Sequence, residues 1–372
     1  MTVRVSVIAC ALLAMSLLAM SARSRSSRPP QPLTAERDYT GSASVGDFFS
    51  LRLDPATQTL TYYNRSNGDA ATVPYSASSD GTYILNDPSG NLTSAYEVPN
   101  FGLLVAAQRA GPNHGSLALI TALRTAPFAL ASLAKQQYNY LQFRTTSGGP
   151  EAGSLVIDAR GDVSLNGYRP YTRWGAGSRP SAFTHASISA AQFQEDSSGT
   201  FLKVADPRGG VDYVFGMANG VFVVDTANGA VLAFKKAASK SFDRAFAATY
   251  QAVYYEKIGV TVDANRQESG TADLGHATVT IDAAAQVTVS DADGNIMLQA
   301  PLTPVADAAY LYGTAGQLKD PCYGLFTFRV YRGGQPQDVF ATFVNGAVLF
   351  SSFVPTSRVG YGYEYLYGVG LK

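Results

Sequence analysis

Strand-like strings recur along this chain at a long, fixed spacing, and that recurrence limits the folds open to it. A Tyr-rich hexamer begins at Tyr138, Tyr250 and Tyr363, reading YNYLQF, YQAVYY and YEYLYG, about 112 residues apart each time. The string NGAVL occurs at 228–232 and again at 345–349. A repeat of this length indicates a structural unit that has been copied along the chain.

The copies superpose best around three aspartates. The segment SLRLDPATQTLTY surrounds Asp54, SLVIDARGDVSLN surrounds Asp158, and TVTIDAAAQVTVS surrounds Asp282. In each copy alternating apolar residues precede the Asp and follow the turn, which is typical of a β-hairpin. Dipeptides such as Asp80-Gly81 and Asp293-Gly294 supply the positive φ angles that tight hairpins need. The sequence therefore predicts an all-β fold of three antiparallel β-meander repeats of about 110 residues each.

The C-terminal end of the chain bears on how the repeats are arranged. A further Tyr-rich strand at 363–366 has no unit behind it, so we expect it to complete the first or the last sheet. Closure of this kind protects sheet edges. A propeller-like ring with two four-stranded blades per unit is the favoured arrangement, and tandem β-barrels or sandwiches are the alternative. The Ala/Lys-rich connectors at 126–137 and 237–248 lack strand alternation, which predicts a short helix in each.

The N-terminal residues resemble an export leader. Arg4 precedes an apolar run at 5–20, with Ala19 and Ser21 well placed for cleavage. We expect export to the periplasm, the cell surface or the medium, and the Cys-poor exported chain is typical of bacteria. The predicted segments are a signal peptide at 1–21, a Ser/Pro/Arg-rich tether at 22–37, β repeats at 38–136, 137–248 and 249–353, and a closing strand at 354–372.

Charge and cysteine content exclude several classes of partner and scaffold. Removal of Arg4 with the leader leaves 27 basic residues against 28 acidic ones, and only 15% of the chain is charged. A near-neutral chain of this kind lacks the positive field that nucleic acids or anionic membranes require. Cys322 is the one cysteine left after cleavage, so no internal disulfide is possible. We expect no nucleic-acid partner, and no membrane span in the mature chain.

Motifs of catalytic or metal chemistry are weak in this sequence. The three histidines, at 114, 185 and 276, have no ligand-type neighbours, and DADGN at 291–295 lacks the acidic residue that closes a calcium loop. Ser132 and Lys135 form an S-x-x-K pair without its usual partner motifs. We therefore expect no metal and no cofactor, and the sequence assigns no catalytic residue.

One segment stands apart from the repeats. The middle unit carries NGYRPYTRWGAGSRPSAFTH at 166–185, which has no counterpart in the other units. Long loops of this kind are uncommon unless they are functional or disordered. Aromatic faces stack on sugars, and guanidinium groups bind carboxylates or phosphates with paired hydrogen bonds. The alternative is an ordered cap over a neighbouring sheet. The predicted ligand-binding residues are Tyr168, Arg169, Tyr171, Arg173, Trp174 and Arg179.

Together these observations predict an exported, non-catalytic β-repeat protein that binds a glycan, a surface component or a protein partner. Two alternatives stay open. A propeller-type polysaccharide hydrolase or lyase would gather carboxylates from distant strands, with glycosidase pairs separated by about 5–10 Å. A structural protein would use its Tyr-rich strands for self-assembly at a surface.

Overall fold

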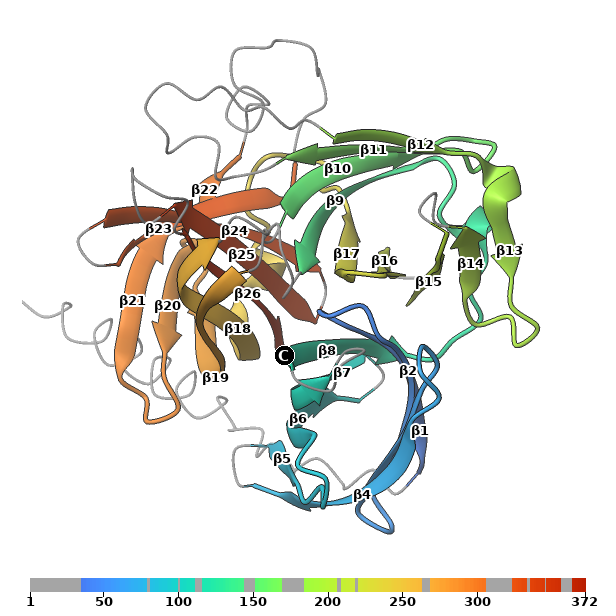
Figure 1. The fold of residues 1–372 in the computed structure, drawn as a ribbon. Helices are drawn as coiled ribbons and strands as arrows, with labels where there is room; N and C mark the ends of the chain where they lie inside the picture. The colour runs from blue at the N-terminus through green and yellow to red at the C-terminus, as the bar shows by residue number, and fades with distance from the viewer. Residues whose placement is uncertain are drawn as a thin grey trace, which may run out of the picture. The chain divides into compact units, whose positions relative to one another are not determined.

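Three antiparallel β-sheets make up the fold in the computed structural model, and each curls round on itself (Figure 1). The structure describes residues 35–372 except 79–80, 100, 111–115, 144–150, 169–183, 206–208, 218–219, 263–267, 306–322, 333–334, 345 and 356–362. The sheets have eight or nine strands, so the all-β prediction and the antiparallel meanders are confirmed. The favoured propeller-like ring is not confirmed, because these sheets are not four-stranded blades. The tandem-barrel alternative fits the structure.

The first sheet is a closed barrel of consecutive strands, in which β8 returns to pair with β1. Alternate residues of each strand face inward, and they form a buried apolar cluster that includes Leu51, Leu53, Val73, Val105 and Ile120. The strands are β1 (Arg37–Ala43), β2 (Phe48–Asp54), β3 (Thr59–Asn64), β4 (Ala70–Ala77), β5 (Thr82–Leu85), β6 (Leu92–Val98), β7 (Gly102–Ala110) and β8 (Ser116–Arg124).

The second sheet follows the same path, and its last strand pairs with its first. It differs at one place: the two ends of its strand order, β12 and β13, follow one another in the chain and are joined by the 3-10 turn η3. The elements are β9 (Gln136–Phe143), β10 (Glu151–Ile157), β11 (Val163–Tyr168), β12 (Thr184–Ile188), η3 (Ala190–Gln192), β13 (Phe193–Glu195), β14 (Leu202–Ala205), β15 (Val211–Met217), β16 (Val221–Thr226) and β17 (Gly229–Lys235).

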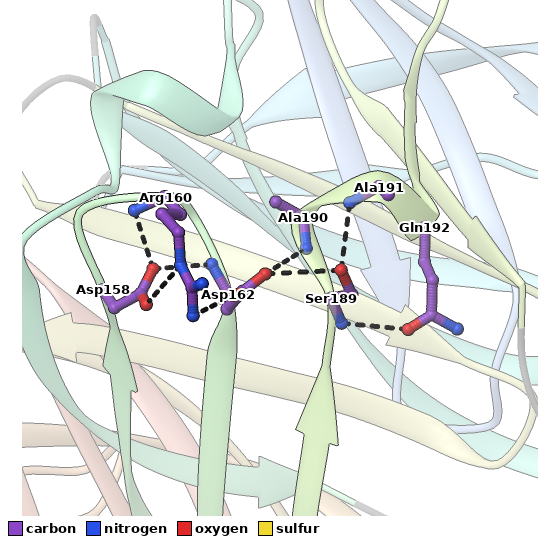
Figure 2. A network of polar contacts seen from close by, with 7 residues as sticks. All are labelled: Asp158, Arg160, Asp162, Ser189, Ala190, Ala191 and Gln192. Atoms are coloured by element: carbon purple, nitrogen blue, oxygen red, sulfur yellow. Dashed lines mark hydrogen bonds and ion pairs between the residues drawn. The ribbon is translucent and has the colours of Figure 1, made fainter.

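A network of polar contacts fixes that junction of the second sheet (Figure 2). Asp158 follows β10, and its carboxylate accepts backbone N–H groups of Arg160 and Asp162 at 2.7 and 3.0 Å. The carboxylate of Asp162 accepts the N–H of Ala190 at 2.8 Å, which ties the β10–β11 turn to η3. Ser189 caps η3 together with Gln192. The aspartate that marks the repeat in sequence is thus a turn-forming residue.

The third sheet has the same meander, and β26 pairs with both β18 and β25 to complete it. Its two edge strands, β21 and β22, are again consecutive, separated only by Leu302. The strands are β18 (Ala248–Val262), β19 (Glu268–Ile281), β20 (Gln286–Ser290), β21 (Ile296–Pro301), β22 (Thr303–Pro304), β23 (Leu325–Arg332), β24 (Gln335–Val344), β25 (Ala347–Pro355) and β26 (Tyr363–Leu371).

The structure separates two kinds of sequence match. The hexamers at Tyr138 and Tyr250 lie in β9 and β18, the first strands of their sheets, whereas the one at Tyr363 lies in the last strand of the third. The two NGAVL strings are also placed differently. The first begins β17, which pairs with β9, and the second begins β25, which is one strand removed from β18. β26 completes the third sheet, which is one of the two positions expected for a C-terminal strand.

The outer faces of the three sheets share one apolar core, which we call the inter-sheet core. Its members include Leu104 from the first sheet, Leu232 from the second and Val369 from the third, all nearly inaccessible to solvent. Tyr367 stacks between Phe143 and Tyr255, with ring centroids 4.7 and 5.0 Å away. Residues 36–372 therefore form one compact unit through contacts between their sheets.

A glycine allows the first two sheets to approach closely. Gly46, in the β1–β2 turn, has a φ of +91°, and a Cβ atom there would lie 2.5 Å from backbone atoms of Thr226 and Ala227. Any other residue at this position would have to adopt the unfavourable left-handed backbone conformation and would also clash at this contact.

The connectors between sheets are less regular than the sequence suggests. The expected helices are single 3-10 turns, η1 (Leu130–Ser132) and η4 (Arg244–Phe246).

Candidate functional site

The interior of the third sheet encloses an apolar cavity of about 190 Å³. Residues from nearly every strand of the sheet line it, as expected where inward-facing positions alternate along a curled sheet. None of the lining residues that the structure describes is acidic or basic. The lining residues are Tyr254, Ala277, Val279, Ile281, Val287, Val289, Met297, Leu298, Leu302, Phe328, Val339, Ala341, Phe343, Val348, Phe350 and Leu366.

Small residues create the room inside this sheet. Ala277 and Ala341 are buried inward-facing positions whose methyl groups leave space beside them. Tyr254 and Phe350 lie flat against glycines: a Cβ at Gly275 would meet the Tyr254 ring at 2.2 Å, and one at Gly368 would meet the Phe350 ring at 2.4 Å. Because the two rings occupy the space above glycine backbone, they form part of the wall instead of filling the centre.

Aromatic rings fill the interior on one side of the cavity. Phe343, which lines it, packs at 5.5–5.8 Å against Phe242, Phe246 and Phe326. The hydroxyl of Tyr250 donates a 2.6 Å hydrogen bond to the Phe246 carbonyl and holds the η4 segment against the sheet. The cavity is therefore bounded on this side by a packed cluster.

The cavity reaches solvent at β21. Met297 lines it and is nevertheless 54% exposed, and its neighbour Ile296 is 66% exposed. Both are large apolar side chains, and of the two only Met297 lines the cavity. The exposed Met297 side chain therefore marks where the cavity opens to solvent.

The first barrel shows how the same architecture is filled in another copy. Glu97 lies inside it and accepts four hydrogen bonds: two from Arg37, one from Tyr39 and one from Tyr83. Both charged side chains are at most 6% exposed. The hydrogen bond to Glu97 raises the pKa of Arg37, and burial raises the pKa values of Tyr39 and Tyr83, with Glu97 adding to the effect. The interior of the first barrel thus contains a buried ion pair between Arg37 and Glu97.

The second sheet is filled by rings. Tyr138 and Tyr140 are each 1% exposed, and Tyr138 packs edge-on against Phe222 with centroids 4.8 Å apart. In the aligned hexamers, Tyr140 corresponds to Ala252 of the third sheet. Ala252 is buried in the core of the third sheet but does not line the cavity, so the aligned hexamers carry no direct signal for it.

Buried ionisable groups outside the cavity support structure. Asp225 of β16 is 2% exposed and accepts a 2.6 Å hydrogen bond from Ser42 of β1, so it joins the second sheet to the first. Burial raises the pKa of Asp225 well above 3.8, the Ser42 hydrogen bond opposes this, and the nearby carboxylates of Asp47 and Asp212 raise it further. Within the described residues, no group of three His, Cys, Asp or Glu side chains is arranged to hold a metal ion.

We expect the Asp225 carboxyl to make stability fall as pH rises. An acid whose pKa is raised by folding contributes its full stability below its unfolded pKa, near 3.8, and loses that contribution as pH rises through the folded value. Asp225→Asn keeps an acceptor for Ser42 but cannot ionise. Its free energy of unfolding, measured with urea across a pH series, should therefore decline less than that of the wild type. Asp293→Asn, in an exposed turn, serves as the control, and an identical decline in the wild type and D225N would contradict the assignment.

The residues predicted from sequence to bind a ligand fall largely outside the described part of the chain. Arg169, Tyr171, Arg173, Trp174 and Arg179 lie in 169–183, which the structure does not describe. Tyr168 ends β11, where it pairs with Ala152. The predicted leader at 1–21 is outside the described residues as well, as are residues 22–34 of the predicted tether at 22–37. Of the described residues, no helix has the length and apolar character needed to cross a membrane.

Comparisons with known proteins give no family. No protein-family model matches the chain, and no curated protein matches it. Two solved structures of transferrin binding protein B from Haemophilus parasuis, described as a vaccine antigen, match 91% of this chain and 76% of that one at 9% identity, with TM-scores of 0.31 and 0.26. The DNA polymerase III beta chain of Streptococcus pneumoniae matches at 9% identity over 97% of this chain and 98% of that one, with a TM-score of 0.14. Similarity this low carries no inference about what the chain does.

Proposed function

We propose that this chain is a non-catalytic binding protein that holds a small apolar molecule inside the third sheet. The observation that carries the proposal is the cavity of about 190 Å³ with its lining of aliphatic and aromatic side chains. Binding sites for small molecules are concave, mostly apolar and largely formed in advance. An apolar cavity of about 150 Å³ is known to stay dry and to bind benzene. The larger cavity here has room for a comparable or slightly larger guest.

The surroundings of the cavity support binding over catalysis. General acid–base and nucleophilic chemistry need ionisable or nucleophilic groups beside the substrate. Among the described lining residues, Tyr254 alone has such a group. The rigid strands, the inter-sheet core and the packed aromatic cluster beside Phe343 hold the wall in one shape, which lowers the entropic cost of closing around a guest.

Titration with toluene tests the proposal. Isothermal titration calorimetry of the whole chain should show saturable binding of one molecule, with a negative heat-capacity change from burial of apolar surface. Ala341→Phe introduces a ring into the cavity and should abolish this signal. Ile84→Phe adds the same ring at a position of the first barrel that is 51% exposed, and binding should be unchanged.

Each variant must be shown to fold before its binding is interpreted. Circular dichroism melting of Ala341→Phe establishes this, and Ala277→Leu, which fills the cavity with a smaller side chain, serves if the larger one unfolds the protein. A folded cavity-filling variant that binds toluene as the wild type does would contradict the proposal. Wild-type protein that shows no saturable binding would contradict it as well.

Partners of other kinds remain part of the proposal. We propose that the exported chain also contacts a glycan, a surface component or a protein through the loop residues predicted from sequence. A glycan array and a pull-down with the mature chain test this idea. Trp174→Ala and Arg173→Ala should remove any signal found, since these side chains carry the stacking and guanidinium chemistry. Unchanged binding by both variants would remove this loop from the account.

A further inference from the structure

We infer that the third-sheet cavity selects uncharged ligands with a hydrocarbon body of about seven to nine non-hydrogen atoms, on the scale of the benzene-binding cavity of about 150 Å³. This inference rests on the proposed function and adds the class of ligand. Two observations carry it: the composition of the wall and the volume it encloses.

The described part of the wall offers a charged group no partner. The sixteen described lining residues lack a formal charge, and a charge moved from water into such a site is strongly disfavoured unless it is paired. Tyr254, the one polar side chain among them, already takes part in an interaction within the protein. A carboxylate or an ammonium group on the ligand would have to stay in water at the rim beside Met297. That position would draw the hydrocarbon chain of the ligand partly out of the cavity.

The volume sets the size of the hydrocarbon part. A cavity of about 190 Å³ exceeds the benzene-binding example by about a quarter. An alkyl chain of eight carbons or a methylated benzene ring falls in this range. Larger polycyclic molecules would have to displace rings held against glycine backbone, such as those of Tyr254 and Phe350. Packed interiors resist such displacement.

A set of eight-carbon chains tests the inference on the full-length protein. Octanol, octanoate and octylammonium share one hydrocarbon body and differ in charge, and toluene provides a compact neutral guest. Calorimetry should show toluene and octanol binding, with octanoate and octylammonium at least about tenfold weaker because each brings an unpaired charge. Met297→Lys places an ammonium group at the rim and should raise the affinity for octanoate relative to octanol. Ile84→Lys, on the first barrel, should not.

The outcomes distinguish failure of the proposed function from failure of the inferred ligand class. If no guest binds, both the proposed function and the ligand class are wrong. If octanoate or octylammonium binds as tightly as octanol, the cavity is a binding site but its selection for uncharged molecules is wrong. If toluene and octanol bind and both charged chains are weaker by the expected margin, the inference is supported.

A different observation points to the entry route. Cα atoms of β21 and β23 approach within 8 Å of each other, yet within the described residues β21 pairs only with β20. In the first barrel, the corresponding neighbours β4 and β5 are hydrogen-bonded at Tyr75–Ala77. β22 pairs with β23 only at Thr303 and Pro304 within the described residues, and Met297 of β21 and Phe328 of β23 both line the cavity. We infer that ligands pass between these strands, with Met297 as the side chain that moves aside.

Exchange rates test the entry route. Fluorine NMR of para-fluorotoluene reports how fast a guest enters and leaves. Met297→Ala should speed both steps and Met297→Trp should slow both, each by about tenfold, with little change in affinity, because the residue lies at the rim. Ile84→Trp is the matched control. Unchanged exchange in both Met297 variants, or changes in affinity alone, would place the entrance elsewhere.

Discussion

Glu97→Ala is expected to destabilise the protein by about 3–5 kcal/mol, because it leaves the guanidinium of Arg37 buried without its counter-charge. The Glu97 side chain is 1% exposed, and it accepts two hydrogen bonds from Arg37 and one each from the hydroxyls of Tyr39 and Tyr83. Truncation therefore removes the carboxylate acceptor that Arg37, Tyr39 and Tyr83 share. The midpoint of urea unfolding gives the size of the effect.

The Arg37–Glu97 ion pair is expected to contribute little net stability compared with a pair of apolar side chains in its place. Replacement of a buried pair by apolar residues of similar size is often neutral or stabilising. The double variant Arg37→Met with Glu97→Leu should therefore recover most of the loss. Arg52→Met breaks an exposed pair with Asp38 on the same barrel and should leave the unfolding midpoint unchanged. A double variant as unstable as Glu97→Ala would show that the charges are needed for more than mutual compensation.

Phe48→Ala is expected to cost about 3–5 kcal/mol and to uncouple the first barrel from the second sheet. Phe48 is fully buried, stacks on Tyr213 at 4.3 Å and meets the edge of Phe201 at 5.1 Å. These two contacts cross from β2 to the second sheet. Loss of the ring removes these two contacts between the sheets and leaves the interior of each sheet intact.

Calorimetry distinguishes this effect from ordinary loss of packing. Differential scanning calorimetry of Phe48→Ala should show two transitions where the wild type has one, since the coupling between units is weakened. The neighbouring Phe49 faces the interior of the first barrel, against Tyr62. Phe49→Ala should lower the stability of that barrel without altering its contact with the second sheet. A single, merely shifted transition for Phe48→Ala would contradict the coupling role.

Local patterns in the sequence predicted the strands well because each hairpin carries its own turn chemistry. Asp158 and Asp282 accept backbone N–H groups two and four residues further on, so the aligned aspartates mark real turns. The arrangement of the sheets was harder to predict. A propeller and a set of barrels contain the same alternating strands, and they differ only in which strands pair at long range.

The cavity of the third sheet could not be predicted from the sequence for a related reason. The cavity depends on the summed size of side chains from many strands, and alternation looks the same whether Ala341 or a larger residue faces inward. The pairing of Arg37 with Glu97 spans 60 residues and has no local pattern. The loop around Trp174 attracted notice because its composition is unusual, while the apolar wall of the third sheet resembles any buried strand face.

A crystal of the full-length protein under xenon pressure tests the central claim most directly. Xenon occupies dry apolar cavities without needing a specific contact. The account predicts electron density for xenon inside the third sheet, among Val279, Val339 and Phe350. A third-sheet interior that is filled by its own side chains, or that takes up no xenon while other parts of the protein do, would contradict it.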